Sequence, residues 1–522
     1  MTHTPGTDVR PRLDRKELDV RRWIVLGTLC LCMLMVAMDA NILHTVMPTL
    51  IRELRPTAME QLWIVNAYAL LLAGLLITMG ALSDRYGRRR MLLCGLAVFG
   101  LASLLAEWVR QPWQAIACRA LLGVGGAMIM PTLLSLIRET FGDAKERTIA
   151  LSACGMAGCA GAAVGPVLGG ALVHAFDWQA AFLVNVAIVM VAVPLVAITV
   201  RESVTPRVGT WDWTGVALSF VGMTALVQGI KLLGKPDAAA ADSAAMVAAG
   251  IATMAWFVRR QWRSHDPLLD IRLFGVRGFT AGVAVYAVVM FSLSSTIFLA
   301  SQWLQFVHCQ NPLGAGLWLL PATLSALLAV LAVPYSLARW HVRDVMLAGM
   351  ASISVALFIP ALYTSDSLVP FAVSLACLGA GVSLALSSAT TVVVMAAPAE
   401  RAGSAAALQS TAYEVGNVLG IAVVGSFAAG LYTRTVHVPD GLAASVARAV
   451  RLSVGEAEVA AAGLPQSVGV PLQQAARVAF DKAFSLSCLL VGCAMLVSTL
   501  SIFALVRKSR FHERTGVEAS CS

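Results

Sequence analysis

Long apolar runs, separated by short polar and often basic segments, cover most of the chain. A helix needs about 20 predominantly apolar residues to cross a bilayer, and this criterion predicts fourteen spans. The eighth span is short and rich in Ala, so twelve is the alternative count, in which the seventh and eighth do not cross. The predicted spans are 23–47, 62–82, 91–108, 113–137, 148–173, 179–200, 213–232, 243–260, 279–304, 314–336, 345–363, 370–396, 403–432 and 479–506.

The composition agrees with a membrane protein and excludes a soluble one. Of 522 residues, 58% are hydrophobic and 13% are charged, and the mean hydropathy is +0.78. Soluble domains are about 45–50% apolar and about 25% charged. The 11 Cys residues form no CxxC pair, so neither a zinc site nor a disulfide framework is expected. We therefore expect an all-α polytopic membrane protein.

The basic residues indicate how the chain is oriented. The net charge is +9, and most Lys and Arg residues fall in the N-terminal tail and in alternate short loops. This pattern is the topology signal of cytoplasmic loops, not a nucleic-acid binding signal. Both termini are therefore expected in the cytoplasm. The first apolar run lacks a cleavage pattern and should remain as a span.

A few ionisable side chains fall deep within the predicted spans. Asp39, Arg119 and Glu414 are the main examples. A charge at the centre of a spanning helix costs about 2.5–3.5 kcal/mol on insertion scales, so each residue invites a functional hypothesis. The alternative is an internal ion pair, such as Arg119 with one of the acids, that only holds the bundle together.

Two glycine-containing segments point to helix movement. The turn GALSDRYGRRRM (80–91) places Gly and Asp among arginines, although a topology anchor explains the arginines equally well. The run GMAGCAGAAVGPVLGG (155–170) carries small residues three or four apart, which let two helices pack closely. Pro166 removes a backbone donor and bends the helix.

The sequence lacks the motifs of nucleotide-driven or enzymatic chemistry. GIKLLGKP (229–236) resembles a phosphate-binding loop but has Pro236 where a magnesium-binding Ser or Thr is required. No dinucleotide fingerprint, metal-spaced His/Cys cluster or nucleophile elbow occurs. We therefore expect no enzyme activity, no cofactor and no metal, with the proton motive force as the energy source.

These segments together resemble the major facilitator superfamily, and within it the fourteen-helix drug/proton antiporters of quaternary-ammonium and methyl-viologen compounds. WQAAFLVNV (178–186) and TAYEVGNVLG (411–420) also resemble family segments. Helix 10 has no acidic residue, and TVMP replaces the commoner VALP. Both features depart from the family pattern at positions that bear on the substrate range. The matching signature residues are Gly80, Leu82, Asp84, Arg85, Gly87, Arg88, Arg89 and Leu92 after helix 2; Arg119, Gly123, Gly125 and Gly126 in helix 4; Gly161, Gly165, Pro166, Gly169 and Gly170 in helix 5; and Asp39 and Pro48 in helix 1.

The resemblance implies two six-helix bundles that give alternating access to a central cavity. It implies that Arg119 assists proton coupling and that the helix 5 glycines shape the moving interface of exporters. The inner gate would comprise Gly80, Asp84, Arg85, Gly87 and Arg88. The resulting organisation is a tail (1–22), an N-terminal bundle (23–200), an extra helix pair with linkers (201–278), a C-terminal bundle (279–506) with a long outer loop of short helices (433–478), and a second tail (507–522).

The resulting hypothesis is a proton-coupled exporter of lipophilic or quaternary cations in the bacterial cytoplasmic membrane. Asp39 would carry the proton and Glu414 would recognise the cation. Trp63, Tyr68, Trp303 and Tyr413 would add cation–π contacts, each worth about 0.5–2 kcal/mol. The expected partners are the drug, protons and membrane lipid, without nucleic acid, and the chain is expected to be a monomer. An antiporter for neutral or anionic compounds, a proton-coupled importer and a non-transporting membrane sensor are the alternatives.

Overall fold

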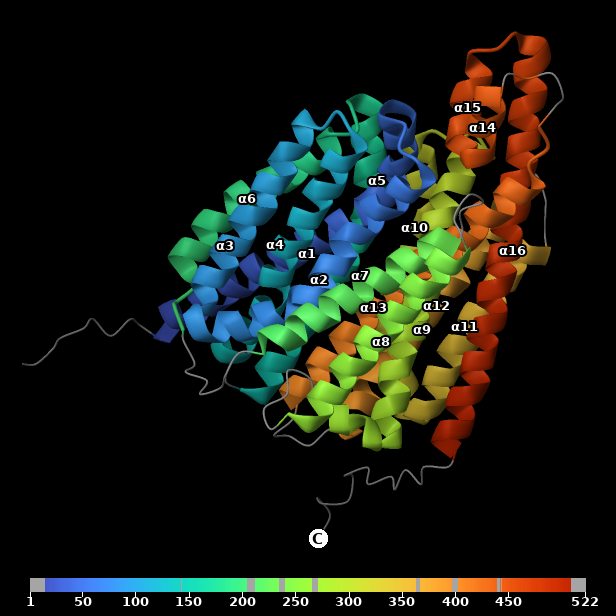
Figure 1. The fold of residues 1–522 in the computed structure, drawn as a ribbon. Coiled ribbons are helices and arrows are strands. Elements are labelled where there is room, and N and C mark those ends of the chain that lie inside the picture. The colour runs from blue at the N-terminus through green and yellow to red at the C-terminus, as the bar shows by residue number, and fades with distance from the viewer. Residues whose placement is uncertain are drawn as a thin grey trace, which may run out of the picture.

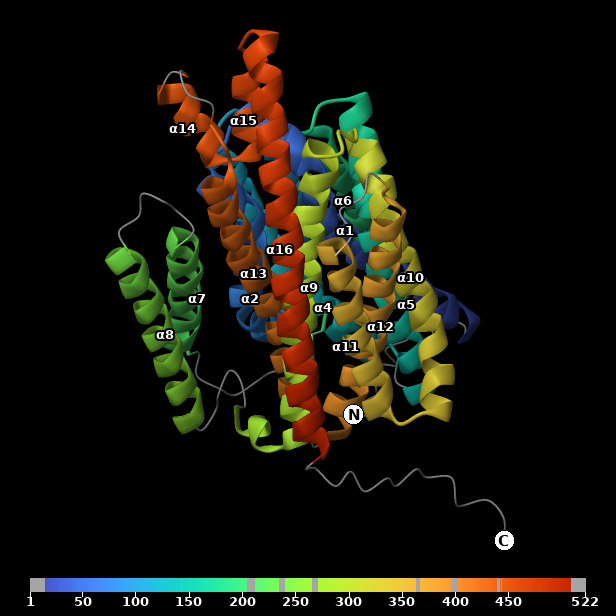
Figure 2. The ribbon, with the colours of Figure 1, turned by 90° about the vertical axis from the view of Figure 1, so that its right-hand side faces the viewer.

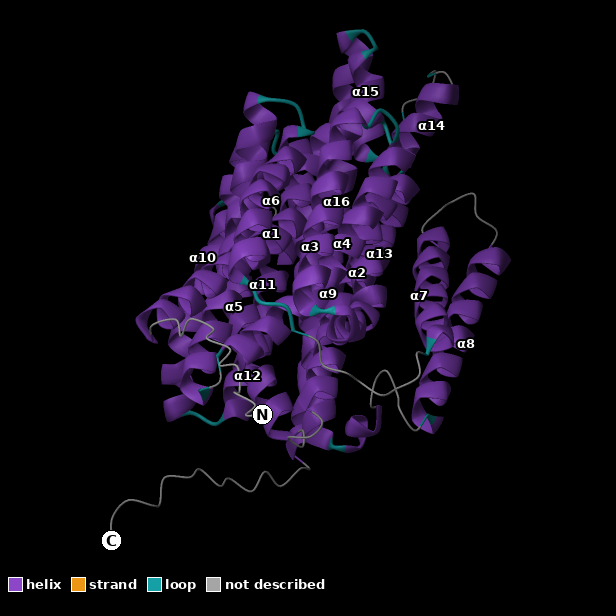
Figure 3. Cartoon of the chain, turned by 90° about the vertical axis from the view of Figure 1, so that its left-hand side faces the viewer, coloured by secondary structure: helices purple, strands orange, loops and turns teal. Residues whose placement is uncertain are grey.

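The computed structural model is helical throughout the residues that it describes. These residues are 15–141, 143–203, 212–233, 240–264, 271–362, 367–396, 402–438, 442 and 444–507. Within these ranges the chain forms helices and connecting loops, with no strand (Figure 3). The expected all-α polytopic fold is confirmed. Most of the predicted N-terminal tail and nearly all of the C-terminal tail lie outside the described residues.

Most of the described residues are helical. Two of the helices are short 3₁₀ turns, η1 (Ala106–Trp108) and η2 (Ile271–Gly275). The α-helices are α1 (Arg15–Leu54), α2 (Ala58–Tyr86), α3 (Arg88–Leu105), α4 (Pro112–Thr140), α5 (Ala144–Ala175), α6 (Ala180–Thr199), α7 (Trp213–Leu233), α8 (Ala240–Arg263), α9 (Arg277–Phe306), α10 (Pro312–Arg339), α11 (Val342–Leu362), α12 (Val369–Ala396), α13 (Ala402–Thr435), α14 (Ala444–Leu452), α15 (Val454–Ala462) and α16 (Gln466–Arg507).

Twelve helices of the described part are long and apolar enough to cross a membrane. The two remaining long helices are α2, in which several side chains lie outside the described residues, and α7, which has a shorter apolar stretch, Ala217–Ile230. The weak eighth predicted span, α8, does meet the criterion. The choice between fourteen and twelve spans stays a prediction.

The long helices form two bundles with the same internal packing. In the first bundle α1 packs on α5 and α6, and α4 packs on α2 and α3. The second bundle repeats these contacts, since α9 packs on α13 and α16, and α12 packs on α10 and α11 (Figure 1). The two six-helix bundles therefore form a structural repeat, as in transporters built from duplicated bundles.

The two ends of the bundles differ. α1 begins and α16 ends on one side, which we call the terminal side (Figure 1). On the opposite side α14, α15 and the first turns of α16 project beyond the other helices, and we call this the hairpin side (Figure 2). The predicted outer loop (433–478) is thus largely helical in its described residues, and its last part, from Gln466, belongs to the long helix α16.

The bundles meet closely on the hairpin side. The Gln305 side chain of α9 donates a hydrogen bond of 3.1 Å to the Thr45 carbonyl of α1. A Cβ atom at Gly170 of α5 would lie 2.5 Å from the Pro312 carbonyl oxygen of α10. A Cβ at Gly425 of α13 would lie 2.8 Å from the Leu62 side chain of α2. The structure therefore has its hairpin side closed.

Candidate functional site

A buried ion pair lies inside the N-terminal bundle. The guanidinium of Arg119, on α4, donates a 2.8 Å hydrogen bond to the carboxylate of Asp39, on α1. The side chain of Asp39 is fully buried, and that of Arg119 is 3% exposed. An isolated charge here would be strongly unfavourable, and the opposite charge together with hydrogen bonds makes the burial possible. The internal ion pair considered as the alternative for these residues is therefore present.

Asn185 of α6 completes the coordination of this carboxylate. Its side-chain amide donates to Asp39 at 2.7 Å and also to the Ser103 hydroxyl of α3 at 3.3 Å. Side chains of four helices, α1, α3, α4 and α6, thus join in one hydrogen-bonded group around Asp39. The sequence analysis did not single out Asn185 or Ser103, although Asn185 lies in the WQAAFLVNV segment. The amide of Asn185, a polar group within an otherwise apolar span, was the sequence feature that could have identified it.

Tyr68 of α2 links this ion pair to the C-terminal bundle. The Arg119 guanidinium lies 4.5 Å from the centroid of the Tyr68 ring, a favourable cation–π distance. The Tyr68 hydroxyl is buried without a hydrogen-bond partner among the described residues. It interacts electrostatically with Asp39 and Arg119 and also with Glu414 and Tyr413 of α13. Tyr68 therefore lies within electrostatic range of both candidate acids.

Glu414 occupies a different environment from Asp39. It is 6% exposed, and its carboxylate forms a hydrogen bond with the side chain of Asn417, one turn along α13. Within the described part of the chain, no basic side chain forms an ion pair with it. Its neighbour Tyr413 is 36% exposed. Glu414 is thus a buried acid that forms no ion pair within the described part of the chain.

The two tryptophans predicted to bind substrate lie elsewhere. The Trp63 indole N–H donates at 2.8 Å to the side chain of Gln228 on α7. The Trp303 indole N–H donates at 2.7 Å to Asp481 of α16, and its ring stacks on Phe484 with centroids 4.9 Å apart. Neither contact joins the group formed by Asp39, Arg119, Tyr68 and Glu414.

The glycine-rich face of α5 contacts both bundles. A Cβ at Gly161 would lie 2.3 Å from the Leu34 carbonyl oxygen of α1, so only glycine fits there. Gly165 and Gly169 face Met38 and Ile42 of α1 in the same way. The other edge of α5 meets α10, where the Pro166 carbonyl faces Gly316. The predicted close-packing face is present, and its movement stays a prediction.

The predicted gate residues gather at the terminal side of the N-terminal bundle. Gly87 has φ +107°, a conformation that favours glycine, and a Cβ there would lie 2.3 Å from a carboxylate oxygen of Glu202. Arg88 pairs with Glu139 of α4 at 2.9 Å.

The remaining gate residues lie close by. Gly80 faces Pro131 of α4, with 3.3 Å between its Cβ position and the proline side chain. The Arg85 guanidinium lies over the Tyr86 ring. The side chain of Asp84 lies outside the described residues.

Glu202 is a residue that the sequence analysis missed. Its carboxylate accepts hydrogen bonds from the backbone N–H groups of Arg89 and Arg90, at 3.1 and 3.2 Å. An anion at a helix N-terminus is favoured by the helix dipole. The segment after α6 therefore caps α3 and holds the turn that carries Gly87. The described residues contain no cluster of His, Cys, Asp and Glu that would hold a metal ion.

Comparisons with known proteins agree with this architecture. Residues 29–339 match the model of the Major Facilitator Superfamily. The multidrug efflux pump LfrA of Mycolicibacterium smegmatis is 38% identical over 508 residues, covering 97% of this chain and 99% of the relative. The methyl viologen resistance protein SmvA of Salmonella typhimurium is 33% identical over 493 residues, covering 94% and 99%.

Solved structures share the fold at low sequence identity. An inward-facing, unoccupied bacterial homologue of the human lysosomal transporter Spinster aligns with a TM-score of 0.66 and 15% identity, covering 93% of this chain and 98% of that one. This likeness concerns the fold alone. The family model and the full-length relatives together show that the chain belongs to the Major Facilitator Superfamily, a family of membrane transporters.

Proposed function

We propose that this protein is a proton-coupled multidrug efflux antiporter that exports lipophilic or quaternary cations. The single observation that supports this most strongly is the pairing of two unlike buried acids around Tyr68. Asp39 is neutralised by Arg119, and Glu414 has no cationic partner among the described residues. The names of LfrA and SmvA, a multidrug pump and a methyl viologen resistance protein, agree with this substrate class.

Glu414 is the proposed cation-recognition residue. A cation that enters the space between the bundles pairs with the Glu414 carboxylate. Tyr413, partly exposed beside it, provides an aromatic face for the same cation. In a site of low dielectric such a charge pair is stronger than it is in water.

Asp39 is the proposed proton-coupling residue. A proton that binds the Asp39 carboxylate removes the negative charge that holds Arg119. The freed Arg119 charge then lies beside Tyr68, next to Glu414, and repels a cation bound there. Proton binding thus promotes drug release, and loss of the proton restores the ion pair and the cation site.

The proton gradient provides enough free energy for this exchange. One pH unit corresponds to about 1.36 kcal/mol per proton. A membrane potential of 100 mV adds about 2.3 kcal/mol for each net charge moved. In this scheme the gate around Gly87 and Arg88 and the α5 glycine face move between the two states. The energy source is the proton motive force, with no bound cofactor.

The test is gradient-driven ethidium movement in proteoliposomes, with wild type and Asp39→Asn compared under an imposed pH gradient. We expect ethidium movement against its gradient in wild type and its loss in Asp39→Asn, with downhill exchange retained. If tight wild-type vesicles show no gradient-driven movement of ethidium or methyl viologen, the proposal is wrong.

An antiporter for neutral or anionic compounds is the second candidate. The absence of an acid in α10 and the TVMP segment after Asp39 favour it over the remaining alternatives. It predicts that Glu414→Gln leaves drug recognition intact, because no cation needs the carboxylate. A non-transporting sensor predicts no flux in any variant.

The proposed setting is the cytoplasmic membrane of a bacterium, with both termini in the cytoplasm and the hairpin side outside. The distribution of basic residues supports this orientation. The proposed partners are the drug, protons and membrane lipid, and the proposed functional unit is one chain. Protease protection of the C-terminal tail in oriented vesicles tests the orientation.

A further inference from the structure

The helix pair α7–α8 lies over one of two equivalent seams between the bundles. α5 packs on α10, and α2 packs on α13, and the structural repeat relates these two seams. α7 packs on both α2 and α13, with α8 on its outer side (Figures 1 and 2). The pair belongs to neither six-helix repeat, so its contacts make the α2–α13 seam different from the α5–α10 seam.

On the terminal side, the pair is attached to the C-terminal bundle. A separate apolar cluster joins Leu218 of α7 and Phe257 of α8 to that bundle. The other buried members of the cluster are Leu273, Phe279, Val283, Val393, Ala405 and Leu408.

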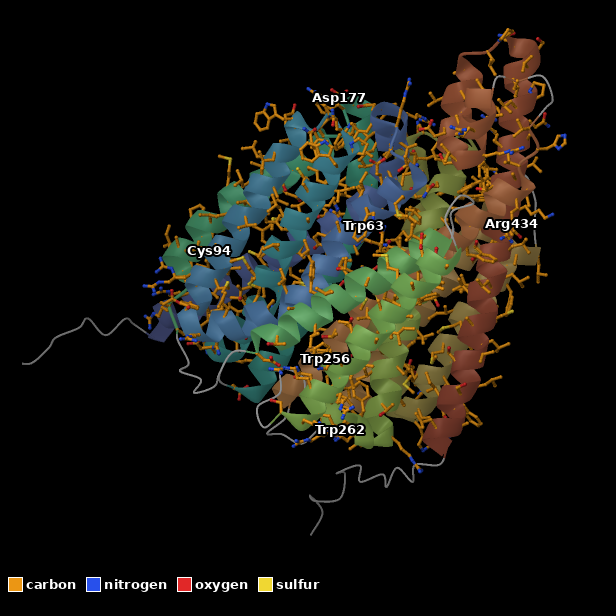
Figure 4. The ribbon with its side chains drawn as sticks, viewed as in Figure 1. Trp63, Cys94, Asp177, Trp256, Trp262 and Arg434 are labelled. Carbon is orange, nitrogen blue, oxygen red and sulfur yellow. The ribbon has the colours of Figure 1, made fainter. Side chains whose placement is uncertain are left out.

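On the hairpin side, the pair is attached to the N-terminal bundle. The Gln228 side-chain oxygen, near the end of α7, accepts the 2.8 Å hydrogen bond from the Trp63 indole of α2. Two turns earlier, the Phe220 ring lies 3.1 Å from the Cβ position of Gly74. Figure 4 shows Trp63 on α2, in the region that the upper part of α7 approaches. The pair therefore bridges the two bundles.

Leu62, the residue before Trp63, packs directly in the closed α2–α13 seam. Leu62 of α2 lies against Gly425 of α13, as described above. Opening of the hairpin side requires α2 to move away from α13, while α7 remains attached to the C-terminal bundle through the apolar cluster. The Trp63–Gln228 hydrogen bond must then break or lengthen.

We propose that Gln228 is a positioning residue of the transport cycle: it holds Trp63 and thereby stabilises the state in which the hairpin side of the α2–α13 seam is closed. This inference rests on the proposed function, because it assumes that the two bundles alternate. One hydrogen bond of ordinary net strength shifts a two-state equilibrium roughly 2- to 12-fold.

The test measures the exposure of the seam rather than transport. Leu62→Cys is introduced, and N-ethylmaleimide labelling of the peptide that contains residue 62 is followed by mass spectrometry. Gln228→Met, which removes the acceptor and keeps the volume, should raise the labelling rate roughly 2- to 12-fold. The matched control is Thr224→Val, one turn earlier on α7, whose buried hydroxyl has no partner in the described structure. It should leave the rate unchanged.

A double-mutant cycle separates positioning from general loosening of the helix. Trp63→Phe removes the donor, so adding Gln228→Met to it should cause little further increase. Equal labelling in wild type and Gln228→Met, or additive effects in the cycle, would overturn the inference. If Leu62→Cys does not fold, hydrogen exchange at the start of α2 gives the same comparison with native Leu62. Because neither readout requires drug flux, failure here is distinct from failure of ethidium transport.

Discussion

Asp39 and Glu414 are both buried acids on long helices, but their surroundings are opposite. Asp39 accepts hydrogen bonds from Arg119 and Asn185, so its charge is balanced within the N-terminal bundle. Glu414 interacts with Asn417 on its own helix and with Tyr68 across the seam. A balanced acid responds to a proton by releasing its partner, whereas an unbalanced acid attracts a cation. This contrast supports the different roles that we propose for the two residues.

The largest expected effect follows from removing the charge of Asp39. Asp39→Asn leaves Arg119 buried without a counter-charge, which costs about 3–5 kcal/mol of stability. We expect a clearly lower unfolding temperature in detergent and the loss of gradient-driven ethidium movement.

The control for this prediction is the double variant Asp39→Asn with Arg119→Gln. It removes both charges, so it should recover much of the stability while transport stays uncoupled. Equal stability of wild type and Asp39→Asn would show that the ion pair does not hold the bundle.

Glu414→Gln should leave the stability unchanged and reduce transport. Because no basic partner is left without its counter-charge, we expect an unfolding temperature close to that of wild type. Methyl viologen efflux should fall at least about tenfold, which corresponds to about 1.4 kcal/mol of lost interaction. Ser426→Ala, which removes a buried unpartnered hydroxyl from the same helix, is the matched control. Unchanged efflux in Glu414→Gln would favour the antiporter of neutral or anionic compounds.

Tyr68 variants distinguish the ring from the hydroxyl. Tyr68→Phe keeps the ring over Arg119 and removes an unpartnered group, so transport should remain within about twofold of wild type. Tyr68→Leu removes a cation–π contact worth about 0.5–2 kcal/mol and should reduce transport several-fold. Initial rates of ethidium efflux measure both changes. A severe defect in Tyr68→Phe would mean that the hydroxyl acts in the proton path.

The smallest expected effect is the pH dependence of hydrogen exchange at the start of the α7–α8 pair. Burial raises the pKa of Asp212, but hydrogen bonds from Arg260, from the Gly215 N–H and from Gln261 outweigh it, so the pKa is lowered overall. An acid with a lowered pKa in the folded state stabilises that state above its unfolded pKa of about 3.9. Amide protection factors at the start of α7, which correct the exchange rate for its intrinsic pH dependence, should therefore be constant from neutral pH to about pH 4 and fall below it.

Asp212→Asn provides the control for the pH prediction. Its protection factors at the start of α7 should be lower at neutral pH and should not fall further below pH 4. The same acid-induced loss of protection in Asp212→Asn and wild type would exclude Asp212 as its source.

Much of the fold was predictable because a segment that crosses a membrane must be apolar, so each span is visible as an apolar run in the sequence. The apolar runs gave the helices, since a spanning segment must satisfy its backbone hydrogen bonds internally. The outer loop was harder to predict. Its last part, from Gln466, belongs to the long helix α16, and neither hydropathy nor charge marks where a helix leaves the membrane without ending.

The charged residues of the site could be predicted from the sequence, but the residues that they and the aromatic side chains contact could not. Asp39, Arg119 and Glu414 stand out because charges in spans are costly. The sequence does not show which helix packs against which face of a neighbour. The contacts of Trp63 with α7 and of Trp303 with α16 could therefore not be predicted. Asn185 was missed because a neutral amide carries a weaker signal than a charge.

The most direct test of the account is proton release on drug binding. Purified protein in weakly buffered detergent is mixed with methyl viologen while a pH dye reports the released protons, and binding is measured separately. The account predicts proton release by wild type, binding without release by Asp39→Asn, and little binding by Glu414→Gln. Proton release that persists in Asp39→Asn would contradict the assignment of proton coupling to Asp39.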